Sequence, residues 1–75
     1  MNKFLFALVS CESGNFYIIN KIRRDIYTVE KEFQKTMWDT EETRYKQISG
    51  MLNTYNEAVQ FIETLDTIVE IVEQE

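Results

Sequence analysis

The chain has 75 residues, no histidine or proline, one cysteine and two glycines, and it carries a net charge of −5. This length corresponds to one domain, residues 1–75, with little room for an enclosed active site beside a core. Without histidine or a second cysteine, the chain lacks the usual groups of a nucleophilic triad, a zinc cluster or an internal disulfide. Two glycines also exclude a glycine-rich phosphate-binding loop. We therefore expect a protein that is not an enzyme and uses no cofactor or metal ion.

The N-terminal stretch "MNKFLFALVSC" fits both an export signal and a β-strand. A lysine, an apolar run and a cysteine follow one another in the order of a lipoprotein signal. The apolar run, 4–9, is shorter than the roughly 7–15 residues of such a signal, and no segment approaches the roughly 20 apolar residues of a membrane span. We favour a strand in a cytoplasmic protein, without lipoprotein export. Cys11 is then a small buried hydrophobic residue, with a redox or dimer-forming thiol as the alternative.

A second β-prone run, 16–22, follows the turn-forming residues 12–15. Gly14 can take the positive φ that such a turn needs. Two β-prone runs around a short glycine-containing loop are typical of a β-hairpin, so we expect strands at about 3–11 and 16–22. With a loop at 13–14, both faces of this hairpin are apolar and both need cover. One face carries Leu5, Val9, Cys11 and Ile18, and the other carries Phe4, Phe6, Leu8 and Ile19.

Residues 25–38 fit both a strand and a helix. Every even position from 28 to 36 is polar, which indicates a strand, while apolar residues at 26, 29, 33 and 37 follow helical spacing. We favour strand–turn–strand and keep a helix over 25–38 as the alternative. The turn is expected at "WDTEET", 38–43, and the next strand at 44–51.

The clearest helix signal lies at "NTYNEAVQFIETLD". Thr54 and Glu57 have the spacing of a capping box, in which the hydroxyl accepts from the Glu57 amide and the carboxylate accepts from the Thr54 amide. We therefore expect a helix over about 55–65. Its apolar stripe consists of Tyr55, Ala58, Val59, Ile62 and Leu65. The β-branched residues of 67–73 favour a last strand, with a continued helix as the alternative.

Together these elements predict an α+β fold. A small antiparallel sheet starts with the N-terminal hairpin and is packed by one or two helices. One helix of this length covers only one face of a sheet. The other apolar face of the hairpin therefore needs a partner, so we expect self-association or a tightly held partner chain.

The acidity is concentrated in the C-terminal third. Residues 52–75 contain six acidic residues and no lysine or arginine, whereas 1–51 hold seven acids and all eight bases. An acidic face can dock a basic protein surface or imitate the phosphates of a nucleic acid, and it can also serve only for solubility. Tryptophan is favoured at interface hot spots. The candidate partner-binding residues are Glu57, Glu63, Asp66, Glu70, Glu73 and Trp38.

These features predict a small acidic macromolecule-binding module, above all a protein-binding inhibitor or adaptor. One alternative is an acidic nucleic-acid mimic that occupies a DNA- or RNA-binding groove, and another is a structural homo-oligomer that associates through the apolar hairpin. Direct nucleic-acid binding is not expected, because acids are mixed among the bases and the domain is acidic. Small size, the missing proline and histidine, and abundant Ile, Asn, Lys, Glu and Tyr are typical of an accessory protein from an AT-rich genome. A bacteriophage protein that acts on a host or defence protein would have this composition.

Overall fold

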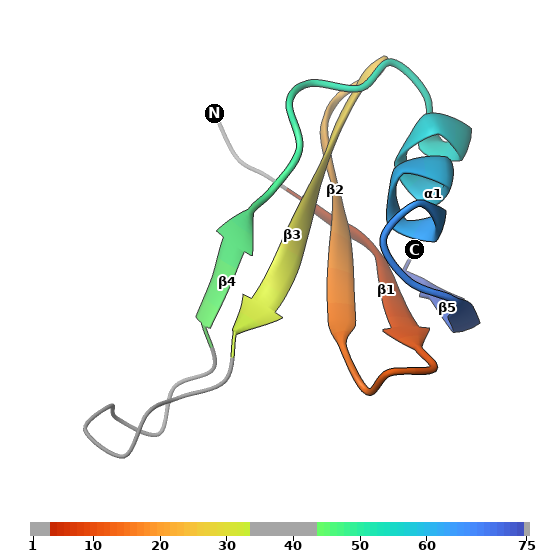
Figure 1. The fold of residues 1–75 in the computed structure, drawn as a ribbon. Coiled ribbons are helices and arrows are strands. Elements are labelled where there is room, and N and C mark those ends of the chain that lie inside the picture. Colours follow the sequence, from red (N-terminus) through yellow and green to blue (C-terminus); the bar gives the residue numbers. More distant parts are fainter. Residues whose placement is uncertain (1–3, 34–43, 75) are drawn as a thin grey trace.

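A computed structural model of the chain describes residues 4–33 and 44–74 (Figure 1). Within these residues the chain forms one sheet and one helix. The α+β class is therefore confirmed. The strands are β1 (Phe4–Cys11), β2 (Phe16–Arg23), β3 (Ile26–Phe33), β4 (Arg44–Gln47) and β5 (Ile68–Glu73), and the helix is α1 (Tyr55–Glu63).

The five strands lie in the order β4-β3-β2-β1-β5, and every neighbouring pair is antiparallel. Strands β1 to β4 lie side by side in chain order. The chain then returns through α1 and adds β5 beside β1 (Figure 1). The two edges of the sheet are therefore β4 and β5.

The loop of the N-terminal hairpin consists of residues 12–14, between Cys11 and Asn15. The Cys11 amide donates to the Asn15 carbonyl and the Gly14 amide donates to the Cys11 carbonyl, each at 3.0 Å. Gly14 has a φ of 95°, the positive value that its place in the turn predicted. The predicted strands of the hairpin are confirmed, but the predicted loop at 13–14 is one residue too short.

The longer loop shifts the hairpin register by one residue. Val9 pairs with Tyr17, and Leu8 pairs with Ile18. The predicted faces were therefore wrong for the second strand, because a register slip of one residue moves every side chain to the other face. Ile19 lies in the core with Val9, and Ile18 lies on the opposite face.

The predicted faces were also wrong for the first strand, because its pairing is irregular between Leu5 and Ala7. The irregularity places Leu5 on the face opposite Val9 and Phe6 on the face opposite Leu8.

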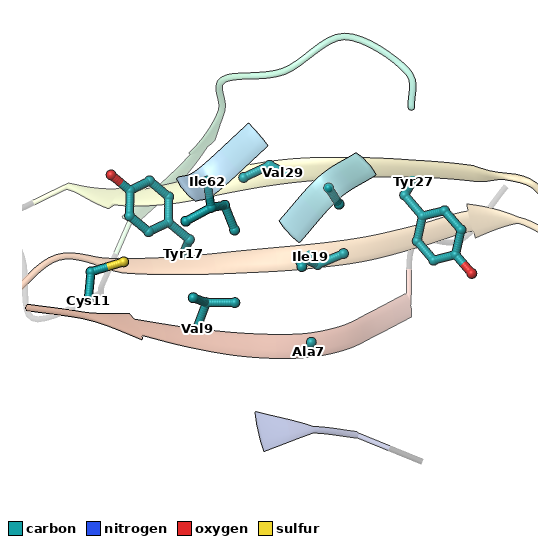
Figure 2. Packing of buried hydrophobic residues seen from close by; sticks show 9 residues of the cluster. Ala7, Val9, Cys11, Tyr17, Ile19, Tyr27, Val29 and Ile62 are labelled. Carbon is teal, nitrogen blue, oxygen red and sulfur yellow. The ribbon is translucent and has the colours of Figure 1, made fainter. Parts of the chain in front are cut away.

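The core lies between one face of the sheet and α1. Figure 2 shows side chains of β1, β2 and β3 on this face, with Ile62 of α1 packed among them. The pairing of β1 with β2 is irregular between Leu5 and Ala7, and Phe6 packs against the core here. Its ring centroid lies 5.7 Å from that of Tyr27 and 5.0 Å from that of Tyr55, with both pairs edge-on. The buried hydrophobic residues are Ala7, Val9, Cys11, Tyr17, Ile19, Tyr27, Val29, Ala58 and Ile62.

Residues 26–33 form a strand, so the favoured interpretation of this stretch is confirmed and the helical alternative is wrong there. β3 pairs with β2 on one side and with β4 on the other. Backbone pairing along both sides stabilises the strand more than helical spacing stabilises an isolated helix. The turn predicted at 38–43, which includes Trp38, lies outside the described residues.

β4 ends at Gln47, earlier than the predicted strand at 44–51. The next residues still follow β3, but with irregular bonding. The Val29 amide donates to the hydroxyl of Ser49 at 2.9 Å, so a side chain replaces a backbone carbonyl. Further on, Tyr27 and Leu52 form an isolated bridge.

α1 begins with the predicted cap and ends two residues before the predicted limit. The Thr54 hydroxyl accepts from the Glu57 amide at 3.1 Å. The Glu57 carboxylate accepts from the Asn53 amide at 2.8 Å, one residue earlier than predicted. The amides of residues 65 and 66 both donate to the Ile62 carbonyl, which closes the last turn. The chain then forms β5, so the predicted last strand is confirmed and the continued helix is wrong, because pairing with β1 holds 68–73 extended.

Candidate protein-binding surface

α1 packs on only one face of the sheet, and no other described element packs on the second face. We call this second face the open face. Side chains alternate between the two faces along a strand, so the strand pairings show which residues share the open face. Its exposed and half-buried residues are Leu5, Leu8 and Ser10 of β1, Phe16 and Ile18 of β2, Glu30 and Glu32 of β3, Tyr45 and Gln47 of β4, and Glu70 and Val72 of β5. Asn20 and Thr28 face the same way but are buried.

The centre of the open face is apolar. Leu8 pairs with Ile18 on one side and with Val72 on the other, which makes a row across three strands. Phe16 lies in the next row, opposite Ser10. Phe16 is 39% exposed and Val72 is 44% exposed. Apolar side chains that are exposed together, with polar residues around them, mark protein interaction sites.

Charge is divided between the two faces of the sheet. The open face carries three glutamates, two on β3 and one on β5. Lys31 and Lys46 pair with each other on the face of α1. Lys21 lies on that face too, with its ammonium 5.9 Å from the ring centroid of Tyr27. The alternation Glu30-Lys31-Glu32 produces this division, because neighbouring residues of a strand face opposite ways.

Glu30 and Glu32 were not among the predicted site residues, although this alternation is a signal for them. Once 26–33 is a strand, its even positions form one acidic row. Glu32 is positioned by the Tyr45 hydroxyl, which donates to it at 3.2 Å. Burial, followed by the charge of Glu32, raises the pKa of Tyr45, so this donor keeps its proton.

The structure does not gather the predicted carboxylates on one surface. Glu70 pairs with Ser10 and faces the open side, whereas Glu73 pairs with Ala7 on the face of α1. There Glu73 accepts a hydrogen bond from Tyr55, and burial, together with the charge of Glu73, raises the pKa of that tyrosine. Glu63 is exposed at the end of α1.

Glu57 and Asp66 are engaged inside the chain. Glu57 caps α1, as described above. The Asp66 carboxylate accepts from the Ser13 hydroxyl, from the Asn15 side-chain amide at 3.2 Å and from the Thr67 backbone amide at 2.8 Å. The bond from Ser13 is the largest cause of a lowered pKa at Asp66. Both carboxylates therefore hold local structure, and Glu70 is the predicted acid that lies on the open face.

Two hollows are lined by described residues, one beside α1 and one at the end of β2. A groove of about 390 Å³ runs beside α1, where the Lys31 ammonium lies 5.8 Å from the ring centroid of Phe33. A second hollow of about 410 Å³ lies at the end of β2 along residues 21–24. The described residues that line them include no carboxylate or thiol. The groove is lined by Asn15, Tyr17, Lys31, Phe33, Ile48, Phe61 and Leu65.

Cys11 is 7% exposed at the end of β1. Burial, together with the nearby charge of Asp66, raises the pKa of its thiol. The thiol therefore stays protonated at neutral pH and packs as a small hydrophobic group. Across 4–33 and 44–74, no three His, Cys, Asp or Glu side chains are grouped to hold a metal ion. Those ranges also contain no helix long and apolar enough to cross a membrane.

No protein-family model, curated protein or solved structure matches this chain. The open face is therefore the feature by which its function can be judged. Its apolar centre and its glutamates define the chemistry of a surface that would fit against it.

Proposed function

We propose that this chain is a small acidic protein-binding module, an inhibitor or adaptor, that binds its partner through the open face. The partner presents an apolar patch bordered by lysine or arginine. The observation that supports this most directly is the apolar row Leu8, Ile18 and Val72, which runs between the glutamates of β3 and that of β5.

The two parts of the open face contribute differently to binding. Burial of the apolar centre supplies affinity, at about 25 cal/mol for each Å² removed from water. The glutamates steer a basic partner toward the face and repel acidic proteins, so they act on the association rate and on specificity. This division of roles predicts partner binding that weakens as salt screens the charges.

The same charges disfavour contact between two copies through their open faces. A face-to-face contact brings the glutamates of each copy near those of the other while water is excluded. Like charges in such a contact cost several kcal/mol. A foreign partner of opposite charge therefore fits the open face better than the homo-oligomer through the apolar hairpin that the sequence allowed.

The acidic residues suit protein binding better than imitation of a nucleic acid. Duplex DNA carries one charge for about every 1.7 Å of its axis, so a mimic needs a dense line of free carboxylates. Glu57 and Asp66 are hydrogen-bonded within the chain, and Glu70 and Glu73 face opposite ways. The composition suggests that the chain is a bacteriophage protein and that its partner is a host or defence protein.

The test uses two bait proteins with the same change of charge. The open-face variant carries Glu32→Lys and Glu70→Lys. The control variant carries Glu12→Lys and Glu63→Lys, at exposed positions outside the open face. Both baits and the wild-type chain are used to capture proteins from cells of the native host, and binding kinetics are then measured with the purified partner at low and high salt.

We expect the wild-type chain and the control variant to bind the partner at similar rates. The open-face variant should associate more slowly, and the difference should shrink at high salt. Equal association rates for the two variants at low salt would contradict the proposal that the partner binds at the open face. Competition by DNA for the same partner would move the function to the nucleic-acid mimic.

A further inference from the structure

β5 is an edge strand whose outer side carries backbone groups without a neighbouring strand in the sheet. The Gln74 amide donates to the Phe6 carbonyl at 2.7 Å, so Gln74 faces β1. In an antiparallel ladder, alternate residues bond to the same neighbour. Residues 70, 72 and 74 therefore bond toward β1, and the N–H and C=O groups of Ile71 and Glu73 point away from the sheet.

The composition of β5 leaves this edge open to another strand. Natural edges are blunted by charged side chains, especially lysine, and by proline, bulges or very short length. β4 has such protection, because it is four residues long and carries Lys46. β5 is six residues long, "IVEIVE", with no lysine or proline. Val69 and Val72 are 67% and 44% exposed along it.

We propose that two copies of this chain pair through β5, antiparallel, with Val72 on the two-fold axis. In this register Ile71 of each copy lies opposite Glu73 of the other, and their outward N–H and C=O groups bond to each other. Val72 faces Val72 of the second copy on the open face. Glu70 faces Gln74, so no glutamate lies directly opposite a glutamate.

This register keeps the charges of β5 away from direct opposition. Glu70 and Glu73 lie on opposite faces of the sheet. Where the two β5 strands meet, each copy therefore contributes one glutamate to each face of the sheet. Like charges directly opposite each other destabilise strand pairs, and this register avoids them. The two-fold axis stands perpendicular to the sheet, so both α1 helices lie on one side and both open faces join on the other.

This dimer goes beyond the proposed function and is measured without any partner. The two effects also respond to salt in opposite directions. Each copy carries a net charge of −5, so salt that screens the repulsion strengthens the dimer, whereas it weakens binding of a basic partner. Loss of the dimer therefore does not imply loss of partner binding, and loss of partner binding does not imply loss of the dimer.

The test uses substitutions at the two-fold axis. Val72→Lys and Val72→Glu each place two like charges opposite each other, and we expect the dissociation constant of the dimer to rise on the order of tenfold or more. Met51→Lys, at a 75% exposed apolar residue outside β5, is the matched control and should dimerise like the wild-type chain. Sedimentation equilibrium gives each constant, and circular dichroism confirms that each variant is folded.

A mixture of the two Val72 variants provides the decisive measurement. If residue 72 lies opposite itself, Val72→Lys and Val72→Glu should form a mixed dimer although neither dimerises alone. Val72→Cys should likewise form a covalent dimer under mild oxidation, while Val69→Cys should not. A wild-type chain that is monomeric up to about 1 mM overturns the proposal. Dimers that survive both Val72 charge variants, or variants whose mixture stays monomeric, overturn it as well.

Discussion

The Ser13 hydroxyl donates a hydrogen bond to the Asp66 carboxylate, although 53 residues separate the two in the chain. Ser13 lies in the loop between β1 and β2, and Asp66 lies between α1 and β5. The Glu12 amide of the same loop donates to the Thr67 carbonyl at 2.8 Å. These bonds join the N-terminal hairpin to the segment that places β5 beside β1.

We expect Asp66 to make the fold sensitive to acid. Its pKa in the folded chain is lowered from 3.8, chiefly by the Ser13 hydrogen bond. Because the folded value lies below the unfolded one, the stabilisation is complete above the unfolded pKa and is lost as the pH falls through the folded pKa. Urea midpoints from neutral pH to about pH 2 measure this loss.

The acid dependence should change when Asp66 is replaced. Asp66→Asn should lower stability at neutral pH and lose less on acidification than the wild-type chain. Glu63→Gln, at an exposed position, is the control and should keep the wild-type profile. Identical profiles for Asp66→Asn and the wild-type chain would show that this carboxylate does not link stability to pH.

Thr28→Val should stabilise the fold. Thr28 and Asn20 pair across β3 and β2 and are 3% and 6% exposed, yet the Thr28 hydroxyl and the Asn20 side-chain nitrogen have no hydrogen-bond partner. Valine has the same shape without the buried hydroxyl, so the free energy of unfolding should rise by about 1 kcal/mol. Thr67→Val, at an exposed position, should stay within about 0.5 kcal/mol of the wild-type value. Urea unfolding measures both, and a loss of stability for Thr28→Val would contradict the argument.

Ser49→Ala should destabilise the fold. The buried Val29 amide donates to the Ser49 hydroxyl, which in turn donates to the Gly50 carbonyl at 2.8 Å. Without the hydroxyl, a buried amide loses its acceptor, at a cost of about 1–3 kcal/mol. Hydrogen exchange should accelerate at Val29, and Ser49→Thr should restore part of the protection. Unchanged exchange at Val29 would mean that another acceptor takes over.

Ile62 and Leu65 should differ sharply in their contributions, although both belong to the predicted apolar stripe of the helix. Ile62 is fully buried in the core, whereas Leu65 lies beyond the end of α1 and is 53% exposed. Ile62→Ala should lower the free energy of unfolding by about 2–5 kcal/mol, and Leu65→Ala should change it by about 0.5 kcal/mol or less. Denaturant titration with both variants measures the contrast, and equal losses would mean that α1 continues to residue 65.

The elements themselves follow from interactions that act over a few residues. A β-prone apolar run marks the strand at 4–11, period-two alternation marks the strand at 26–33, and the Thr54 hydroxyl marks the start of α1. The early end of α1 is less visible in the sequence, because no glycine or proline follows it. β-branched residues from Ile68 onward supply the signal for a last strand, and pairing with β1 stabilises that strand.

The sequence by itself determined the positions of most strands and of the helix, the N-cap of α1 at Thr54, and the acidity of the C-terminal third. Only the tertiary structure decided which residues share a surface. A loop of two residues or of three satisfies the local turn chemistry, but the choice exchanges the faces of Ile18 and Ile19, and packing on α1 depends on it. Asp66 is one more acidic residue in the sequence, and it becomes a structural group only because the sheet brings the hairpin loop beside it. Local patterns carry no information about such partners, because hydrogen bonds and packing across a sheet join residues far apart in the chain.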